Sequence, residues 1–308
     1  MIATTYTLTP ANAEKPVFLG SIIDAETEAL LDSNGVATTR DPAGAVVAMT
    51  LSPRRLPGSV EWVHSPYMGV DSLVGRLPET VKLLTRTVDG MPAQMADYAL
   101  TAVKAERWQW QLLLREQSQG IWVKRPILRS VGDRKALIMG TGHVGATTGR
   151  ALRPVFSGVL GVSHSGRAVE GFDQVWALGD TDIPWSQVDC LVIALPLTAD
   201  TTAIVSDSVF AALRDAHVVM IGRGATVDFD ALHRAIQADN VRHATIDVYP
   251  VEPPPADEWF WSDPDVTMTP HISGIPDPMD PVTSFLNARR ALMEGRQPEG
   301  IVDKERGY

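Results

Sequence analysis

A glycine-rich run at Gly140–Gly145 follows the apolar segment Lys135–Met139 and precedes Ala146–Leu152, which can be helical. In such a run the first glycine permits a tight turn, the second lets the backbone approach a pyrophosphate, and the third permits close packing of helix on strand. Peptide N–H groups at the helix start then face the phosphates. The strand before and the helix after predict a dinucleotide site. Its expected contacts are Gly140, Gly142, His143, Val144 and Gly145.

The end of the next expected strand, Val159–Val162, indicates which dinucleotide binds. NAD-binding chains place an Asp or Glu there, about 20 residues after the glycine loop, to hold the ribose hydroxyls. This chain instead has Ser163, His164, Ser165 and Arg167. A carboxylate would repel a 2′-phosphate, whereas hydroxyls and a guanidinium can bind one. We therefore expect NADPH to be preferred, with NAD as an alternative cofactor. The other interpretation is a solvated turn whose Arg167 points to water.

Three further polar side chains stand in stretches that suit a ligand site. Arg223 lies in Ile221–Asp228 directly after a strand-like run, Glu252 lies in a proline-rich loop, and His271 lies in Thr269–Gly274. Carboxyl ends of strands line the ligand crevice of a doubly wound sheet, so the place of Arg223 suits a substrate anion. Taken singly, such residues are more often a surface ion pair, a solvated acid and a structural histidine.

In this order the motifs resemble those of the D-isomer-specific 2-hydroxyacid dehydrogenase family. The resemblance rests on the dinucleotide loop, Leu195–Thr198 with Thr201, the Arg-Gly segment, Asp247 before the glutamate, and Thr-Pro-His. It covers about residues 60–308, whereas the first 60 residues agree only in their α/β texture. The ending, Gly300–Tyr308, is similar to that of the glyoxylate/hydroxypyruvate reductase branch, which uses NADPH.

The resemblance implies a role for each polar residue. Arg223 is expected to bind the substrate carboxylate and carbonyl, His271 to be the acid/base, and Glu252 to orient and charge the imidazole. Hydride delivery to C2 of a 2-oxo acid creates negative charge on oxygen, which an imidazolium neutralises by giving a proton. By the same resemblance, Asp247 meets the nicotinamide carboxamide. Further cofactor contacts are implied for Leu195, Pro196, Thr201, Ile221, Gly222 and Arg223.

The family presents substrate-binding backbone N–H groups from a Gly-Ala-Gly-Val-Asp loop. Here that loop reads Tyr67-Met-Gly-Val-Asp71, and we expect Met68 and Gly69 to bind the substrate carboxylate through their backbone. Tyr67 and Met68 are larger than the usual residues. Tyr67 either narrows the site toward two- and three-carbon acids or packs outward.

The elements that must position these residues follow from the alternation of short apolar runs with longer amphipathic segments, which is typical of a parallel α/β sheet. Strands are expected at Val17–Leu19, Ala45–Met49, Glu61–Val63, Lys135–Met139, Val159–Val162, Cys190–Leu195, His217–Ile221 and Thr245–Tyr249. Helices are expected at Ala25–Leu31, Pro92–Gln117, Ala231–Ala238 and from an Asp280-Pro281 cap to Gly295. Residues 250–281 hold 9 of the 22 prolines, so a winding loop is expected there.

At 308 residues the chain is long enough for about two domains. The resemblance implies a Rossmann-type doubly wound domain at 100–272, inserted into a smaller flavodoxin-like α/β substrate domain made of 1–99 and 273–308. It also implies a homodimer. The residues Trp108, Trp110 and Leu112–Leu114 either offer an apolar surface to the partner or belong to the core.

Composition excludes several other classes of protein. The net charge is −10 and the positive residues are scattered, which disfavours nucleic acid and anionic membranes as partners. The longest apolar run, Cys190–Leu195, is far below the roughly 20 residues of a membrane span. Residues 1–6 show no secretory signal, and the single cysteine fits a reducing cytoplasm. No cluster has metal-ligand spacing, so no metal site is expected.

We therefore expect NADPH-dependent reduction of glyoxylate or hydroxypyruvate. The alternatives are a dehydrogenase for lactate, for a longer 2-hydroxy acid or for a phosphorylated one, and a dinucleotide-sensing protein without activity. An intact set of Arg223, Glu252 and His271 argues against the sensor, because sensing needs no proton donor.

Overall fold

The computed structural model describes residues 6–124 and 134–308. The expectation that the N-terminus carries no secretory signal rests mainly on residues 1–5, which lie outside the described residues. The chain divides into two compact units, one formed by residues up to Met91 together with Ile275–Tyr308, the other by Pro92–Gly274. No helix in the described part of the chain is long and apolar enough to cross a membrane.

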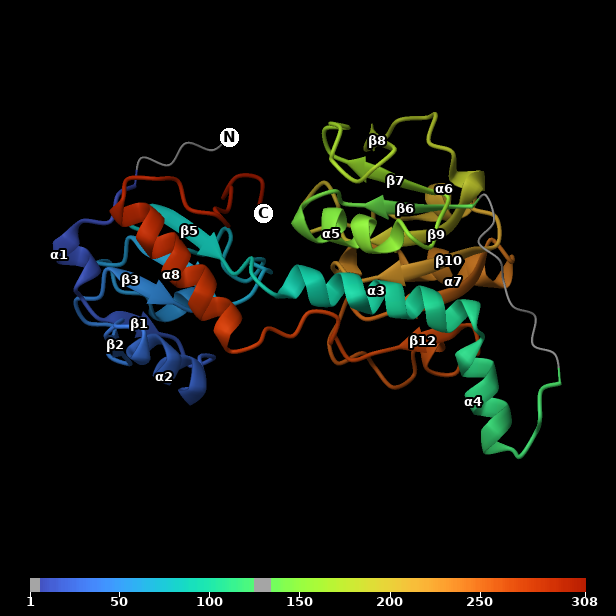
Figure 1. The fold of residues 1–308 in the computed structure, drawn as a ribbon, viewed down its shortest axis with the longest axis horizontal. Coiled ribbons are helices and arrows are strands. Elements are labelled where there is room, and N and C mark those ends of the chain that lie inside the picture. Colours follow the sequence, from blue (N-terminus) through green and yellow to red (C-terminus); the bar gives the residue numbers. More distant parts are fainter. Residues whose placement is uncertain (1–5, 125–133) are drawn as a thin grey trace. The chain divides into compact units, whose positions relative to one another are not determined.

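The unit Pro92–Gly274 is built on a sheet of seven parallel strands (Figure 1). They are β6 (Lys135–Met139), β7 (Gly158–Ser163), β8 (Gln174–Ala177), β9 (Val188–Ile193), β10 (Ala216–Met220), β11 (Val241–Ile246) and β12 (Val266–Met268). Their order, β12-β11-β10-β9-β6-β7-β8, grows outward in both directions from the pair β6 and β9. This is the doubly wound order, and its topological switch point lies between β6 and β9.

Alternation of side chains along β6 separates two cores in this unit. Leu137 and Met139 pack in a cluster that includes residues of α6 (Asp207–Phe210) and α7 (Phe229–Gln237). Ala136 and Ile138 pack in a second cluster, with residues of α3 (Met91–Arg107) and α5 (His143–Leu152). Both faces of the sheet are therefore covered, which explains why its strands read as continuous apolar runs.

The single helix predicted over Pro92–Gln117 is wrong. The chain forms α3 and then α4 (Trp110–Ser118), separated by Gln109, whose φ of +54° is left-handed. The side-chain amide of Gln111 donates to the carbonyl of Val266 (3.4 Å), so the first turn of α4 contacts the start of β12. Helix α4 buries no residue, and Trp108, Trp110 and Leu114 are 52–56% exposed, so these side chains are surface and not core.

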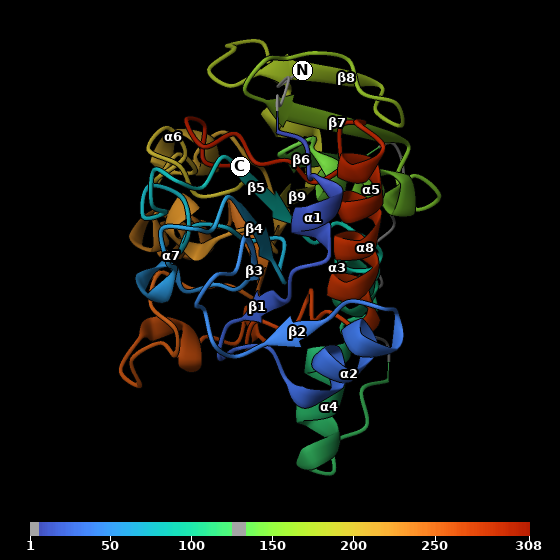
Figure 2. The ribbon, with the colours of Figure 1, turned by 90° about the vertical axis from the view of Figure 1, so that its left-hand side faces the viewer.

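The other unit holds five parallel strands: β1 (Val17–Leu19), β2 (Thr38–Thr39), β3 (Val47–Met49), β4 (Trp62–Ser65) and β5 (Leu83–Arg86). Their order, β2-β1-β3-β4-β5, is that of flavodoxin-like sheets. Three helices contribute to the core on one face: α1 (Pro10–Ala13), α2 (Ala25–Ser33) and α8 (Met279–Met293) (Figure 2). Trp62 stacks on Phe285 of α8 at 5.0 Å. The predicted α/β class is confirmed.

Several element boundaries differ from the predicted ones, and two of the differences change where an aspartate lies. Strand β11 ends at Ile246, so Asp247 and Tyr249 follow the strand and do not belong to it. Helix α8 begins at Met279 after Pro278, and the Asp280 carboxylate accepts the N–H of Asp277 at 3.0 Å. Asp280 is therefore in the first turn and is not the residue before the helix.

His64 in β4 provides a test of the packing of the flavodoxin-like unit. The ring is fully buried, with Nδ1 2.8 Å from the Thr85 hydroxyl, and burial lowers the pKa of His64 from 6.5 to about 3. The unfolded chain therefore binds this proton at a higher pH than the folded one. The stability that neutral His64 provides is complete above pH 6.5 and is lost toward pH 3, at about 1.4 kcal/mol per pH unit.

We predict that His64→Gln flattens the fall in unfolding free energy between pH 6.5 and 4 by about one proton. Urea unfolding followed by tryptophan fluorescence measures this slope. His164→Gln, at an exposed position, is the matched control and should leave the slope unchanged. An identical slope in His64→Gln and the unmodified protein would contradict the prediction.

Candidate active site

The glycine loop lies at the switch point of the seven-stranded sheet. Gly140 has a φ of +96°, and a Cβ there would lie 2.6 Å from the carbonyl oxygen of Ala194, just after β9. A Cβ on Gly145 would lie 1.8 Å from the carbonyl oxygen of Gly140. A Cβ on Gly142 would meet no atom within 4 Å. Packing within the protein therefore requires the first and third glycines, whereas the second opens onto free space.

The start of α5 offers the donors that a pyrophosphate needs. Gly142 precedes the helix, its carbonyl accepts the Ala146 N–H at 2.8 Å, and no side chain caps the helix. The first N–H groups of a helix have no partner within the helix, and they attract anions. Together with the space at Gly142, these donors fit a dinucleotide pyrophosphate.

The loop after β9 packs against this glycine loop, and the loop after β10 packs against the loop after β9. A Cβ on Gly222 would lie 2.5 Å from the carbonyl oxygen of Leu195. The Thr201 hydroxyl donates to the Pro196 carbonyl (2.7 Å) and accepts the Thr198 N–H (2.8 Å), which closes the turn after β9. Ile221 is buried, and its N–H donates to the Ile193 carbonyl at 3.0 Å. The structure thus brings together the predicted cofactor residues of three loops.

The segment after β7 presents polar groups without an acid. The Ser163 hydroxyl accepts the Gly166 N–H at 3.1 Å, and Gly166 has a φ of +63°. His164, Ser165 and Arg167 are exposed beyond this turn. Among the described residues, no carboxylate lies within ion-pair distance of Arg167. A free anionic group could therefore pair with this guanidinium.

Glu252 and His271 form a direct pair. His271 Nδ1 lies 2.7 Å from Glu252 Oε2, and the other carboxylate oxygen accepts the Tyr249 N–H at 3.0 Å. Both side chains are partly exposed, with 43% of His271 and 37% of Glu252 accessible. With Nδ1 engaged by the carboxylate, Nε2 is the nitrogen that can exchange a proton with a ligand.

Asp247 holds the segment that carries His271. Its side chain is fully buried, and Oδ1 accepts the Thr269 hydroxyl (2.6 Å) and the Ile272 N–H (2.8 Å). Oδ2 accepts the Ser273 N–H at 2.8 Å. The contact of Asp247 with a nicotinamide carboxamide stays a prediction; the observed contacts are those of an anchor for the His271 segment.

Arg223 follows β10 in a turn that packs beside the Glu252 loop. Its guanidinium donates to the Gly222 carbonyl at 2.9 Å, and its own carbonyl accepts the Thr226 hydroxyl at 2.7 Å. A Cβ on Gly224 would lie 2.1 Å from the carbonyl carbon of Tyr249, whose N–H binds Glu252. One series of contacts therefore links the turn that carries Arg223 with Glu252, and Glu252 with His271.

The predicted substrate loop belongs to the flavodoxin-like unit and follows β4. Its carbonyl groups are engaged: Ser65 donates to that of Tyr67 (2.8 Å) and Arg86 to that of Met68 (3.3 Å). Within the described part of the chain, the N–H groups of Met68 and Gly69 donate no hydrogen bond. They are available to an anion. Tyr67 is half-buried, which leaves its two predicted orientations open.

Sequence reasoning missed the side chains that support the His271 segment. The Tyr98 hydroxyl lies 2.6 Å from Thr269 Oγ1, and the Tyr249 hydroxyl donates to the Thr269 carbonyl at 3.0 Å. Burial raises the pKa of Tyr98 to about 12 and also raises that of Tyr249. In the sequence Tyr98 reads only as an apolar position of a helix, although a buried phenol requires a hydrogen-bond partner.

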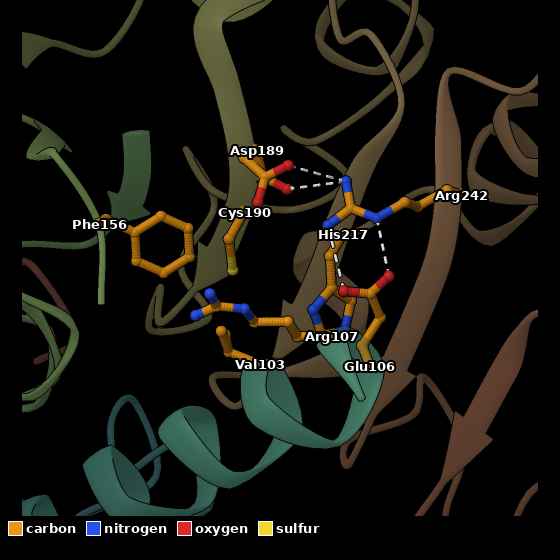
Figure 3. Close-up of a pocket in the computed structure, with 8 residues that line it drawn as sticks. All are labelled: Val103, Glu106, Arg107, Phe156, Asp189, Cys190, His217 and Arg242. Atoms are coloured by element: carbon orange, nitrogen blue, oxygen red, sulfur yellow. Dashed lines mark hydrogen bonds and ion pairs between the residues drawn. The ribbon is translucent and has the colours of Figure 1, made fainter. Parts of the chain in front are cut away.

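A small pocket lies at the opposite, amino edge of the same sheet (Figure 3). Arg242 crosses it and pairs with Glu106 of α3 (2.8 Å) and with Asp189 (3.1 Å). Burial lowers the pKa of His217 well below its usual value and raises that of the Cys190 thiol, so both are neutral. Because Arg242 is already paired with carboxylates, this pocket suits a structural ion network better than a substrate.

The stretch of chain that carries the glycine loop and the carboxylate-bound histidine matches a known family. The NAD-binding domain model of the D-isomer specific 2-hydroxyacid dehydrogenases matches residues 101–273. The chain belongs to this family. The family comprises NAD(P)-dependent oxidoreductases, and the resemblance predicted from the motifs is confirmed.

Individual relatives align with most of this chain. An uncharacterized protein of Streptomyces coelicolor is 37% identical over 252 residues, which are 81% of this chain and 90% of the relative. Glyoxylate/hydroxypyruvate reductase A of Serratia proteamaculans is 30% identical over 262 residues, 82% of each chain. The crystal structure of a D-isomer specific 2-hydroxyacid dehydrogenase from Xanthobacter autotrophicus, in complex with NADPH and MES, superposes with a TM-score of 0.83 at 26% identity and covers 95% of this chain and 99% of that one.

The glycine contacts give two matched variants, one expected to affect mainly stability and the other mainly cofactor binding. Gly145→Ala should destabilise the fold by about 1–3 kcal/mol, because its methyl group would overlap the Gly140 carbonyl. Gly142→Ala should cost about 1 kcal/mol or less, since only the start of α5 is affected. Its methyl group would occupy the space where a pyrophosphate approaches, so the Kd for NADPH should rise on the order of tenfold.

Thermal unfolding and titration of NADPH fluorescence measure the two effects separately. The assignment of the loop would be wrong if Gly142→Ala bound NADPH as tightly as the unmodified protein while remaining folded.

Proposed function

We propose that the protein reduces a small 2-oxo acid, glyoxylate or hydroxypyruvate, to the corresponding 2-hydroxy acid with NADPH. The observation that carries this proposal is the Glu252–His271 pair at 2.7 Å in a domain of this dehydrogenase family. A relative that aligns with 82% of this chain at 30% identity bears the name glyoxylate/hydroxypyruvate reductase A, and a similar structure contains NADPH. Both support the choice of substrate and cofactor.

NADPH, when bound, supplies a hydride to C2 of the substrate. The carbonyl oxygen then takes up negative charge and needs one proton to become a hydroxyl group. In our proposal His271 gives that proton from Nε2, while Glu252 binds Nδ1 and orients the ring. The reverse reaction uses neutral His271 as the base.

The substrate carboxylate requires donors of its own. A guanidinium offers a planar fork that matches a carboxylate, and Arg223 provides one beside the Glu252 loop. The available N–H groups of Met68 and Gly69 are further donors for a carboxylate in this proposal. None of these groups needs the side chain of Tyr67, so its size bears on which acid fits and not on whether an acid binds.

Preference for NADPH follows from the segment after β7. Ser163, His164, Ser165 and Arg167 provide hydroxyl, imidazole and guanidinium groups there and no carboxylate. A 2′-phosphate would gain charge-assisted hydrogen bonds at this place, whereas NADH would lose the carboxylate that usually holds its ribose. NAD remains the alternative cofactor.

We also propose that the protein is a homodimer. Trp108, Trp110 and Leu114 beside or on α4 are more than half exposed, and Trp122 is 85% exposed. Large apolar side chains that are exposed on one short stretch of chain support an interface with a second copy. A cytoplasmic location stays a prediction from the sequence.

The substrate proposal is tested by steady-state rates with glyoxylate, hydroxypyruvate, pyruvate, 2-oxoisovalerate and phosphohydroxypyruvate. We expect the highest kcat/KM with glyoxylate or hydroxypyruvate. His271→Asn should lower kcat about a hundredfold or more, because the proton donor is lost, and should leave the Kd for NADPH unchanged. No turnover of any 2-oxo acid would disprove the proposal, and full activity of His271→Asn would remove it as the donor.

Cofactor preference is tested by Arg167→Ala. Loss of one charge-assisted contact to a 2′-phosphate should raise the KM for NADPH by about tenfold, or about 1.4 kcal/mol, and leave that for NADH unchanged. Arg150→Ala, on the exposed side of α5, is the matched control. An equal KM for NADPH in Arg167→Ala and the unmodified enzyme would show that Arg167 points to water and does not contact the cofactor.

A further inference from the structure

We propose that Tyr98 is a positioning residue for the proton donor, because its hydroxyl acts through Thr269 to fix the segment Thr269–Ser273 that carries His271. This inference rests on the proposed role of His271. It assigns a function in the reaction to a helix residue that lies far from His271 in the sequence.

The segment is attached to Asp247 on both sides of His271. The Thr269 hydroxyl lies before the histidine, the N–H groups of Ile272 and Ser273 lie after it, and all three donate to this one buried carboxylate at 2.6–2.8 Å. The backbone around His271 is thus a short bridge whose two ends share one anchor. Movement of Thr269 would therefore displace the imidazole.

His271 itself adopts a conformation that a histidine seldom takes. Its φ is +53°, and its N–H donates to the Thr269 carbonyl at 3.1 Å. A residue other than glycine persists in the left-handed region only where its surroundings fix it. The surroundings here are the Thr269 and Asp247 contacts together with the Glu252 carboxylate on Nδ1.

The direction of the hydrogen bonds makes Tyr98 the outermost donor. Thr269 has one hydroxyl proton and donates it to Asp247, so its oxygen must accept the proton of the Tyr98 hydroxyl at 2.6 Å. Burial keeps this phenol protonated by raising the pKa of Tyr98 to about 12. In the partly buried series from Tyr98 through Thr269 to the acceptor Asp247, each hydrogen bond strengthens the next.

Helix α3 presents Tyr98 from a fixed position. Ala99, Ala102 and Val103 of this helix pack in the core against β6, β9 and β10. Near the end of the helix, Glu106 binds the buried Arg242 of β11 at 2.8 Å. Side chains held on a rigid element keep a site in its productive geometry.

The test compares Tyr98→Phe, which removes one oxygen atom, with Tyr6→Phe, which removes a phenol hydroxyl from the other compact unit. In Tyr98→Phe we expect kcat to fall about tenfold, with the KM values for the 2-oxo acid and NADPH changing less than about twofold. Deuterium exchange of the Ile272 and Ser273 amides should become faster. Tyr6→Phe should change neither the rate nor this exchange.

Variants of Thr269 show whether the effect passes through this residue. Thr269→Ser retains the hydroxyl and should keep most of the activity, whereas Thr269→Val should lose at least as much as Tyr98→Phe. Because Tyr98 acts through Thr269, adding Tyr98→Phe to Thr269→Val should cause no further loss.

Unchanged kcat and unchanged exchange in Tyr98→Phe would overturn the inference. So would a lower kcat without faster exchange at residues 272 and 273, because the loss would then be general. Failure of the unmodified enzyme to reduce any 2-oxo acid would disprove the proposed function instead, and the exchange measurement would still show whether Tyr98 holds the segment.

Discussion

A single buried carboxylate determines where His271, the proposed proton donor, lies. Asp247 follows β11 directly, is inaccessible to solvent, and accepts three hydrogen bonds from the segment around His271. A buried carboxylate is costly unless it is fully hydrogen-bonded, and an unpaired one would be strongly destabilising. The fold therefore favours the one path of the segment that satisfies Asp247, and on that path the imidazole of His271 meets Glu252.

The second constraint is contact between backbones at the carboxyl edge of the seven-stranded sheet. Gly140, Gly222 and Gly224 each lie so close to a neighbouring loop that a Cβ would come within 2.1–2.6 Å of its backbone. These contacts join the loops after β6, β9, β10 and β11 into one surface. Gly142 is different, since the space beside it is open. Glycine thus serves two purposes in this edge: it brings loops together, and at one position it leaves room for a ligand.

The sequence predicted the features that depend on local pattern. The runs that became β6, β7 and β9 are apolar on both faces, and the glycine spacing carries its own structural reasons, so the sheet and the loop were predictable. The bend at Gln109 was not, because neither Gly nor Pro marks it; Gln111 contacts β12, a pairing of distant segments that periodicity cannot reveal. Tyr98 was missed for the same reason. Its partner Thr269 is 171 residues away in the sequence. The helical pattern shows only that Tyr98 lies on the apolar face of its helix.

The charges of the molecule explain why an acidic chain can hold anions at one edge of a sheet. The net charge is −10. The positively charged side chains nevertheless differ in how many carboxylates lie next to them. At the amino edge Arg242 is buried between Glu106 and Asp189, so its charge is cancelled where it stands. At the carboxyl edge, the uncapped start of α5 and the exposed Arg167 meet no carboxylate within the described residues. Attraction for a phosphate or a carboxylate depends on this local field, because charges farther away than about 8–10 Å are screened by salt. The same screening explains why a net charge of −10 is compatible with a small anionic substrate.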